Sequence, residues 1–264
     1  MIQFVDGVDS LLFNADCLIA MQEIGDNSVD MILCDLPYGT TNCKWDSVID
    51  LKLLWEQYER IIKDNGAIVL TAQTPFDKVL GSSNLKILKY EWIWEKTQAT
   101  GHLNAKKMPM KAHENVLVFY KKIPVYNPIK TFGHKRKVSS KEHKLNTKNN
   151  QTEIYNKSDD FSNYDSTERY PRSIQVFKSD KQKTSLHPTQ KPVALMEYLI
   201  KTYTNEGMVV LDNCMGSGTT GVACKKLNRR FIGIELDEKY FEIAKSRIEL
   251  SAFDTSTQTE SSNE

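Results

Sequence analysis

The sequence lacks any long apolar run, and none of its hydrophobic stretches approaches the ~20 consecutive residues that a membrane-spanning helix requires. The first ten residues, MIQFVDGVDS, also lack the positively charged and then apolar pattern of a signal peptide. Cysteine is scarce: the five cysteines form no C-x-x-C pair, which argues against a disulfide framework and a zinc site. These absences favour a protein without a membrane span that resides in a reducing cytoplasm.

A strong net charge is lacking as well. The 35 Lys and Arg residues nearly balance the 34 Asp and Glu residues, which leaves a formal net charge of +1. The average charge therefore gives no reason to expect a polyanionic partner, and only a local excess would. A chain of 264 residues is long enough for one large α/β domain or for one domain with an inserted module.

Strand-like and helix-like segments alternate in two stretches of the chain. The run VDMILC (29–34) is almost wholly apolar, as expected of a strand that is buried on both faces of a parallel sheet. Further strands are expected over 11–15, 67–73, 91–96, 114–122, 208–212 and 230–235. Helices are expected over 16–24, 51–66, 193–204, 218–228 and 237–250. This alternation predicts an α/β fold with a doubly wound, mostly parallel sheet.

The composition changes between these two stretches. From residue 121 to residue 183 there are fifteen Lys or Arg and seven Asp or Glu, a local net charge of +8, with interspersed aromatic residues. Little apolar periodicity is present there, so this segment is expected to be a separate module or a long insertion. The last residues, 251–264, are polar and rich in Ser and Thr, and are expected to be disordered.

A glycine-rich turn is expected after the strand over 208–212, in the sequence MVVLDNCMGSGTTGVA. A doubly wound sheet binds nucleotide-like ligands at such a junction, and Gly216 and Gly218 would let the backbone approach the ligand closely. No Lys follows Gly218, so the turn is not a phosphate loop, and a ligand without a polyphosphate is implied. The alternative is a tight turn in which Thr219 and Thr220 merely start a helix.

The next predicted strand, RFIGIE, ends in Glu235, about twenty residues beyond the glycines. An acid at that separation accepts hydrogen bonds from both hydroxyls of a ribose. The alternative is an ordinary acidic residue at a helix N terminus, which the helix dipole favours by a few tenths of a kcal/mol. The glycine turn and the acid together favour a site for a nucleoside.

Three motifs of the chain resemble those of the DNA amino-methyltransferases, which use S-adenosylmethionine. The segment DNCMGSGTTGVAC, followed by RRFIGIELDEKYFEIAKSRI, resembles the family's D-P-F-x-G-S-G-T-T and G-I-E-x-x-x-x-Y wording. HPTQKPVALMEYLI (187–200) resembles its H-P-T-Q-K-P motif, and CDLPYG (34–39) resembles its D-P-P-Y catalytic tetrad. The resemblance covers most of residues 11–122 and 186–250, and it implies a Rossmann-like class I methyltransferase fold.

The order of the motifs resembles the permuted order of the family's beta group, because the tetrad precedes the cofactor turn. The implied parts are a catalytic half (1–120), an inserted target-recognition region (121–186), a cofactor-binding half (187–250) and the tail (251–264). In a permuted sheet the strand over 11–15 would lie beside the strand over 230–235. That arrangement would bring Asp16 to the same edge as Glu235 and the glycine turn.

The resemblance implies S-adenosylmethionine as the cofactor. Asp16 would hold the exocyclic amine of the cofactor's adenine, with Cys17 alongside, although Asp16 also suits the N-cap of a helix. Thr189 and Lys191 would line the methionine end, although Thr189 also suits a helix N-cap. The remaining cofactor residues are Asp212, Cys214, Gly216, Ser217, Gly218, Thr219, Thr220, Glu235 and Leu236. No metal is expected, since no partner lies at ligand spacing from His187.

Catalysis is assigned by the resemblance to Asp35, Leu36, Pro37 and Tyr38. An enzyme that alkylates the exocyclic amine of a paired base must flip that base out of the duplex. Tyr38 would stack on the base, while the Asp35 carboxylate and the Leu36 carbonyl accept the amine's hydrogens, so that its lone pair points at the methyl group. Leu36 replaces the usual proline, but Pro37 still restricts residue 36 to an extended conformation. The alternative for CDLPYG is a type I or II turn.

Double-stranded DNA is the implied partner of the basic insertion. Its cations would neutralise phosphates, and the candidates are Lys135, Arg136, Lys137, Arg169 and Arg172. Residues 140–153 are polar enough to be disordered until DNA binds. Without the resemblance, a solvated flexible loop would be the default interpretation.

The leading hypothesis is N6-adenine methylation, because Asp35 begins the tetrad where N4-cytosine relatives commonly have Ser. The alternatives are N4-cytosine methylation, methylation of RNA or of a protein amide, and a catalytically silent DNA-binding module of the same fold. Retention of Asp35, Pro37, Tyr38 and both glycines argues against a silent module. A monomer and a homodimer are both compatible with the sequence, and it leaves open whether a restriction endonuclease partner exists.

Overall fold

The structure is a computed structural model and describes residues 2–5, 10–39, 47–140, 163–179 and 190–251. It divides into two compact units, one formed by residues 1–127 and 173–264 and the other by residues 128–172. Of the helices in the described ranges, none has both the length and the apolar character needed to cross a membrane.

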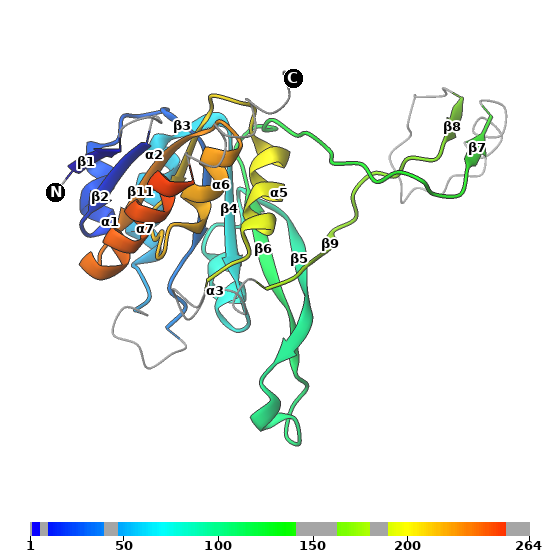
Figure 1. Cartoon of the computed structure of the whole chain (residues 1–264), viewed down its shortest axis with the longest axis horizontal. Coiled ribbons are helices and arrows are strands. Elements are labelled where there is room, and N and C mark those ends of the chain that lie inside the picture. The colour runs from blue at the N-terminus through cyan, green and yellow to red at the C-terminus, as the bar shows by residue number, and fades with distance from the viewer. Residues whose placement is uncertain (1, 6–9, 40–46, 141–162, 180–189, 252–264) are drawn as a thin grey trace, which may run out of the picture. The chain divides into compact units, whose positions relative to one another are not determined.

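One sheet of nine strands runs through the first unit (Figure 1). In spatial order the strands are β1 (Ile2–Val5), β2 (Ser10–Asn14), β11 (Arg230–Glu235), β10 (Val209–Asp212), β3 (Val29–Asp35), β4 (Ile62–Ala72), β6 (Lys111–Phe119), β5 (Leu88–Thr100) and β9 (Ile174–Phe177). The five strands from β2 to β4 are parallel, and β9 is parallel to β5. β1 and β6 pair antiparallel with their neighbours. The predicted α/β fold with a doubly wound, mostly parallel sheet is confirmed.

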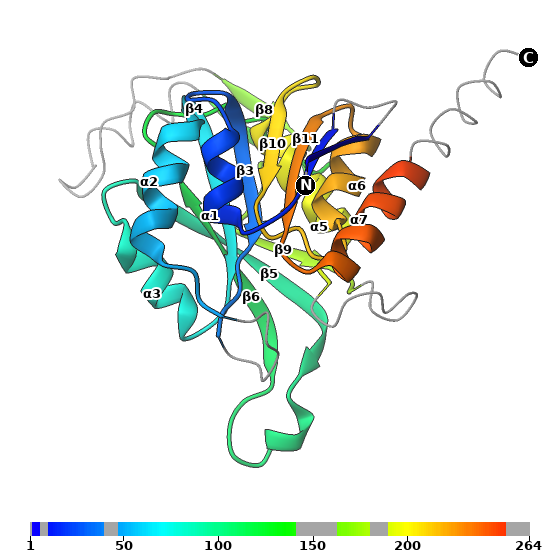
Figure 2. The ribbon, with the colours of Figure 1, turned by 90° about the vertical axis from the view of Figure 1, so that its left-hand side faces the viewer.

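Helices cover both faces of this sheet (Figure 2). One face carries α1 (Cys17–Ala20), the 3-10 turn η1 (Met21–Glu23), α2 (Leu51–Ile61) and α3 (Phe76–Ser83), and the other carries α5 (Val193–Tyr203), α6 (Thr219–Lys226) and α7 (Glu238–Leu250). Within β3, Met31 and Leu33 pack with α5, α6 and α7, whereas Ile32 and Cys34 pack with α1, α2 and α3. A strand that is covered on both sides needs apolar residues on both faces, which is why VDMILC, apart from Asp30, does not alternate.

β2 lies parallel to β11, as the permuted order predicts. The carboxyl ends of parallel strands meet at one edge of a sheet, where doubly wound folds bind their ligands. Asp35, Asp212 and Glu235 are the last residues of β3, β10 and β11, and Asp16 follows β2 by two positions. Four acidic residues from distant parts of the chain therefore come to the same edge.

The predicted helix over 51–66 is too long. α2 ends at Ile61, and Ile62 has an extended backbone (φ −71°, ψ 136°), is buried, and pairs with Val29 as the first residue of β4. The next pair joins Met31 to Ala67, so the intervening residues bulge out, and a Cβ on Gly66 would lie 2.7 Å from the Ile62 side chain. The helical spacing of Ile62 is overridden because the sheet buries this β-branched side chain.

Besides β1, the elements of the first unit that were not predicted include α3 and β9. α3 contains Gly81 and two serines, which are poor helix formers, and it is stabilised by burial of Phe76 and Leu80. β9 is a four-residue edge strand in the segment that the sequence assigns to the insertion, and it pairs with β5. Both elements depend on tertiary packing more than on local sequence.

The second unit contains a small antiparallel pair, β7 (Lys137–Ser139) and β8 (Tyr164–Ser166). The Arg136 guanidinium donates to the Asp165 carboxylate, with an Nε to Oδ1 distance of 2.7 Å. Thr131 and Arg169 exchange two backbone hydrogen bonds of 3.0 and 2.9 Å. Of the segments expected to be disordered, residues 141–153 and 252–264 lie outside the described residues.

Candidate active site

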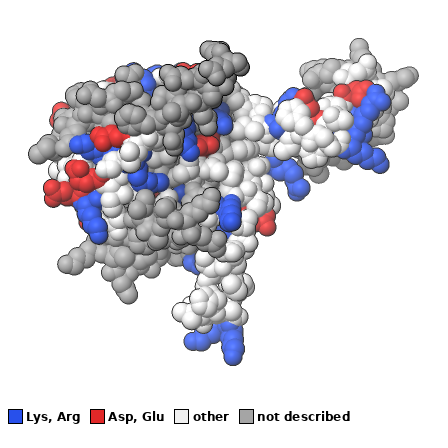
Figure 3. Space-filling model, in the orientation of Figure 1, with Lys and Arg blue, Asp and Glu red and all other residues white. Residues whose placement is uncertain are grey.

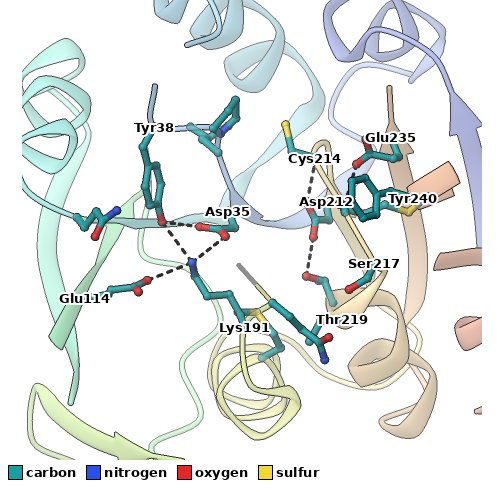
Figure 4. A pocket seen from close by; sticks show the side chains of 18 of the residues that line it. Asp35, Tyr38, Glu114, Lys191, Asp212, Cys214, Ser217, Thr219, Glu235 and Tyr240 are labelled. Carbon is teal, nitrogen blue, oxygen red and sulfur yellow. Dashed lines mark hydrogen bonds and ion pairs between the residues drawn. The ribbon is translucent and has the colours of Figure 1, made fainter. Parts of the chain in front are cut away.

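A cavity of about 560 Å³ lies at the carboxyl ends of β2, β3, β10 and β11 (Figure 4). Among the residues predicted from the sequence, those that line it are Asp16, Cys17, Asp35, Leu36, Pro37, Tyr38, Lys191, Asp212, Cys214, Gly216, Ser217, Thr219, Thr220, Glu235 and Leu236. Gly218 belongs to the same turn, whereas Thr189 lies outside the described residues. One cavity thus collects the candidate catalytic residues and most of the candidate cofactor residues.

The turn between β10 and α6 brings bare backbone to the cavity. Gly216 and Gly218 have φ angles of 51° and 77°, in the left-handed region that favours glycine. A Cβ on Gly218 would lie 2.9 Å from the Cβ and 3.0 Å from the Cα of Ala244 in α7. Glycine at this position is therefore required both by the backbone conformation and by the close approach of α7.

Replacing Gly218 with alanine should damage both stability and cofactor binding. The left-handed backbone costs about 1–2 kcal/mol, and relief of the clash with α7 should cost about 1–3 kcal/mol more. Gly207→Ala is the matched control, because Gly207 has the same φ of 77° but nothing within 4 Å of an added Cβ. In denaturant unfolding, Gly218→Ala should lose more stability than Gly207→Ala. In titration with S-adenosylmethionine, Gly218→Ala alone should bind the cofactor more weakly than wild type. Equal effects of the two substitutions would contradict the argument from close approach.

Asp212, the last residue of β10, stabilises the turn through hydrogen bonds. Its carboxylate accepts a 2.6 Å hydrogen bond from the Thr220 hydroxyl and a 3.1 Å bond from the Cys214 N–H. Burial raises the pKa of this carboxyl to about 6. The first residues of the turn and the start of α6 are thereby tied to the end of one strand.

The raised pKa of Asp212 predicts a pH dependence of stability. The folded chain binds this proton more tightly than the unfolded chain does, between the ordinary pKa of 3.8 and the folded value of about 6. The contribution of this group to the free energy of unfolding therefore falls as the pH rises through that window. Relative to wild type, Asp212→Asn should gain up to about 3 kcal/mol between pH 4 and pH 7. If the free energies of unfolding of Asp212→Asn and wild type, measured with denaturant, changed with pH in parallel, the raised pKa would not belong to Asp212.

Glu235 closes the other side of the turn. Its Oε2 accepts a 2.9 Å hydrogen bond from the Gly216 N–H, and its Oε1 accepts one of 2.9 Å from the Asp237 N–H. Burial raises the pKa of this carboxyl. Each carboxylate oxygen has a second lone pair, so Glu235 can brace the turn and still accept hydrogen bonds from a ligand.

Asp16 and Leu236 flank the same part of the cavity. Asp16 caps α1, with Oδ1 accepting from the Leu18 and Ile19 N–H groups at 2.8 and 3.3 Å. Its side chain is exposed and lines the cavity, so its other carboxylate oxygen is available to a ligand. Leu236 also lines the cavity and is 67% exposed, so its apolar side chain is available to pack against a ring.

The thiols of Cys17, Cys34 and Cys214 lie together, and Cys17 and Cys214 line the cavity. A hydrogen bond with the Cys214 thiol lowers the pKa of Cys17, whereas burial raises the pKa of Cys34 to about 12. Hydrogen bonding with its two neighbours raises the pKa of Cys214. Cys34 and Cys214 therefore remain thiols at neutral pH.

Asp35 stands at the end of β3 with both carboxylate oxygens engaged (Figure 4). Oδ1 accepts hydrogen bonds of 2.5 Å from the hydroxyls of Tyr38 and Thr71. Oδ2 forms an ion pair of 2.7 Å with the Lys191 ammonium. The side chain is thus held in one orientation by groups from three different segments of the chain.

Lys191 is the centre of a row of alternating charges. Its Nζ lies 3.1 Å from the Glu114 carboxylate, which forms a second ion pair of 2.6 Å with Lys96. Burial alone would lower the pKa of Lys191, but the negative charges of Asp35 and Glu114 outweigh it and raise that pKa well above its ordinary value. Burial also opposes ionisation of Glu114, yet the two lysines lower the pKa of its carboxyl. Lys191 therefore stays an ammonium between two carboxylates.

Leu36 and Tyr38 are fixed by packing. Leu36 is buried in the hydrophobic cluster beneath α1, α2 and α3, so packing restrains residue 36 where the family usually has proline. The Tyr38 ring lies 5.4 Å from the ring of Phe76 at an angle of 30°. Burial raises the pKa of the Tyr38 hydroxyl, so this group remains a donor to Asp35.

Sequence reasoning missed Thr71, Lys96 and Glu114. Thr71 lies in β4 and Glu114 in β6, so both are read from the sequence as ordinary strand residues. The one signal in the sequence is that Glu114, a charged residue, begins a run of strand residues, and all residues of that run are buried. Glu114 itself is only 9% exposed. A charged residue in such a position is expected to have a partner.

The candidate DNA-binding residues lie in the second unit. Arg136 pairs with Asp165. Arg169 donates to backbone carbonyls of Ser166, Glu168 and Lys135. Lys135, Lys137 and Arg172 are exposed.

Residues 29–246 match the protein family described as DNA methylase (N6_N4_Mtase). The type II methyltransferase M.HpaI of Haemophilus parainfluenzae is 30% identical over an alignment 271 residues long, and the alignment covers 94% of this chain and 77% of that protein. The type II methyltransferase M2.MboI of Moraxella bovis is 27% identical over 263 residues, which cover 89% and 86%. The chain thus spans most of the length of both relatives.

Two solved structures are similar over nearly the whole chain. The complex of M1.HpyAVI with S-adenosylmethionine has a TM-score of 0.61 and 27% identity, and covers 90% of this chain and 98% of that one. The PvuII DNA methyltransferase, described as cytosine-N4-specific, has a TM-score of 0.67 with 14% identity and covers 93% and 90%. The second likeness concerns the fold alone.

The cavity fits S-adenosylmethionine. The glycine turn presents backbone without side chains, Glu235 and Asp16 offer carboxylate oxygens to hydroxyl and amine donors, and the volume of about 560 Å³ is within the range of cofactor sites. The family match spans most of the chain, and the sheet has the class I methyltransferase arrangement. The chain therefore belongs to the N6/N4 family of type II DNA methyltransferases and uses S-adenosylmethionine as its cofactor.

Proposed function

We propose that this enzyme is a site-specific DNA methyltransferase that methylates the N6 amine of an adenine flipped out of a duplex. The observation that carries the proposal is the shared cavity: the Asp35 cluster and the glycine turn with Glu235 line one space at one edge of the sheet. A methyl donor and an acceptor base can meet there without any movement of the core.

The cofactor is held by the glycine turn and by two carboxylates. S-adenosylmethionine, when bound, supplies a methyl group on a positively charged sulfur. Glu235 accepts hydrogen bonds from the ribose hydroxyls through its free lone pairs, and Asp16 accepts one from the adenine amine. Leu236 covers the adenine ring.

The tetrad orients the target amine. Asp35 and the Leu36 carbonyl accept the two hydrogens of the amine, which favours a tetrahedral nitrogen whose lone pair can point at the methyl group. In the chain alone, the Tyr38 hydroxyl donates to Asp35 Oδ1 at 2.5 Å. The entering amine replaces this hydroxyl as a donor, and the Tyr38 ring then stacks on the base. The displaced proton of the amine passes to Asp35 and on to solvent, while Lys191 keeps its own proton.

Asp35 at the head of the tetrad supports adenine as the target base. N4-cytosine methylation is the alternative, because the same acceptors would serve a cytosine amine. The second unit, residues 128–172, is proposed to read the target sequence. Lys135, Lys137 and Arg172 would contact phosphates there, while Arg136 and Arg169 brace the unit through Asp165 and backbone carbonyls.

The proposal is tested by supplying the purified enzyme with methyl-labelled S-adenosylmethionine and one of three acceptors. These are unmethylated bacterial genomic DNA, RNA, and a mixture of proteins. Label should enter DNA alone, and digestion to nucleosides should place it in N6-methyladenine. Label in N4-methylcytosine would overturn the choice of base. Label in RNA or protein alone would overturn the choice of substrate, and binding of cofactor without any transfer would favour a silent module.

A further inference from the structure

A long hairpin extends from the body of the first unit (Figures 1 and 2). It is made of the ends of β5 and β6 and a tip that contains the 3-10 turn η2 (His102–Asn104). Every residue from 97 to 113 is exposed. The tip nevertheless has its own hydrogen bonds, from the N–H groups of Asn104, Lys107 and Met108 to the carbonyls of Gly101 and Asn104, at 2.8 to 3.0 Å. The hairpin is thus an ordered projection without a hydrophobic core of its own.

The tip combines cations with exposed apolar side chains. Between residues 97 and 113 there are three lysines, Lys106, Lys107 and Lys111, and no Asp or Glu. Figure 3 shows blue side chains gathered at the end of the hairpin. Leu103 and Met108 are 87% and 55% exposed. A solvated loop gains nothing from exposing a leucine and a methionine beside like charges, so this combination suits a binding surface.

The base of the hairpin is a wall of the active-site cavity. Glu95 pairs with His113 and Thr100 with Lys111, so β5 has more residues than β6 over this stretch, and the excess bulges out. The residues of this bulge, 96–99, line the cavity together with Trp94 and Thr100. Lys111 donates to Gln73, another lining residue, at 3.3 Å. The projection therefore begins at the mouth of the cavity that would receive a flipped base.

We propose that the hairpin tip contacts the duplex beside the target base and helps to extrude that base. Lys106 and Lys107 bind phosphates, and Leu103 and Met108 insert between neighbouring bases to fill the space that the flipped base leaves. Side chains of these apolar types act as wedges in DNA-bending proteins. The inference rests on the proposed function, because a wedge is needed only if a base leaves the stack. A second copy of the chain is the less suitable occupant, since two identical tips would bring lysines against lysines.

The cationic part is tested with Lys106→Gln/Lys107→Gln on a duplex of arbitrary sequence, by binding alone. Each phosphate contact that is lost should reduce the slope of log affinity against log salt concentration by about 0.9. The double variant should therefore show a slope reduced by about 1 to 2 and affinity reduced roughly tenfold. Lys52→Gln/Lys86→Gln removes two exposed lysines that do not line the cavity and is the control, which should bind as wild type does.

The wedge is tested with Leu103→Ser/Met108→Ser on a duplex that carries the sequence methylated in genomic DNA. Transfer to the fully paired duplex should fall at least about tenfold, with the salt slope unchanged. A mismatch opposite the target base lowers the cost of extrusion and should restore most of the lost rate. Leu85→Ser is the control, since Leu85 is 67% exposed and lies outside the cavity lining.

Normal transfer and binding by both hairpin variants would overturn the inference while leaving the proposed function intact. Lost transfer without rescue by the mismatch would overturn the wedge. A changed oligomeric state in sedimentation, with unchanged DNA binding, would show that the tip serves a second copy instead. Failure of the wild-type enzyme to methylate DNA would count against the proposed function, whereas methylation of cytosine would leave the hairpin inference standing.

Discussion

Asp35→Ala should lower the rate of methyl transfer by roughly 10²–10³-fold or more, since it removes a preorganised acceptor of the target amine. The affinity for S-adenosylmethionine should change little, because the glycine turn and Glu235 do not touch Asp35. The measurement is single-turnover transfer to DNA together with calorimetric titration of the cofactor. A pure loss of transfer at unchanged cofactor affinity identifies a group that acts on the acceptor base.

Stability is the necessary control for this variant, because Asp35 is bonded to Tyr38, Thr71 and Lys191. Asp50→Ala is a suitable comparison: Asp50 caps α2 through the N–H groups of Lys52 and Leu53, and its loss should cost about 1 kcal/mol without affecting transfer. Loss of cofactor binding by Asp35→Ala, or an unfolded protein, would show that the assigned role is wrong.

Lys191→Met should have the second largest effect. The substitution leaves the Asp35 and Glu114 carboxylates without the cation that lies 2.7 and 3.1 Å from them. Removing one partner of a buried ion pair typically destabilises a protein by about 3–5 kcal/mol. Transfer should fall as well, because Asp35 loses the contact that fixes its Oδ2. Unfolding by denaturant and single-turnover kinetics measure the two effects separately.

A double-mutant cycle with Glu114→Gln separates charge balance from catalysis. Lys191→Met/Glu114→Gln should recover part of the lost stability, because the cluster then holds one cation, Lys96, and one carboxylate, Asp35, instead of one cation and two carboxylates. Transfer should remain impaired, since Asp35 is still untethered. If Lys191 instead serves the methionine end of the cofactor, Lys191→Met should weaken cofactor binding and leave the rate at saturating cofactor nearly unchanged.

The parts of the site that local sequence order predicts without the family resemblance are the glycine turn and the acid at the end of the strand that follows it. The glycine turn with Asp212, and Glu235 at the end of the next strand, follow from local order, because residues at the ends of neighbouring parallel strands must meet. The apolar run of β3 likewise predicts its burial on both faces. Lys191 was expected near the cofactor's methionine, whereas its nearest charged neighbours here are Asp35 and Glu114.

What the sequence did not predict depends on contacts between distant segments. Glu114 and Lys191 are 77 positions apart, and nothing local to either shows that they share a buried ion pair. The end of α2 was missed because Ile62 fits an amphipathic helix as well as a buried strand. The bulge in β5 was missed because it exists only in the register with β6. Each of these features is set by pairing and burial, which override local propensity.

The role of Asp35 and Tyr38 is best tested by the structure of the enzyme bound to a cognate duplex and a non-transferring analogue of S-adenosylmethionine. We expect an adenine outside the stack, with its amine within about 3 Å of Asp35 and of the Leu36 carbonyl. The Tyr38 hydroxyl should then have left Asp35, and its ring should lie on the base. A target base that stays in the stack, or an amine bound away from Asp35, would contradict the account.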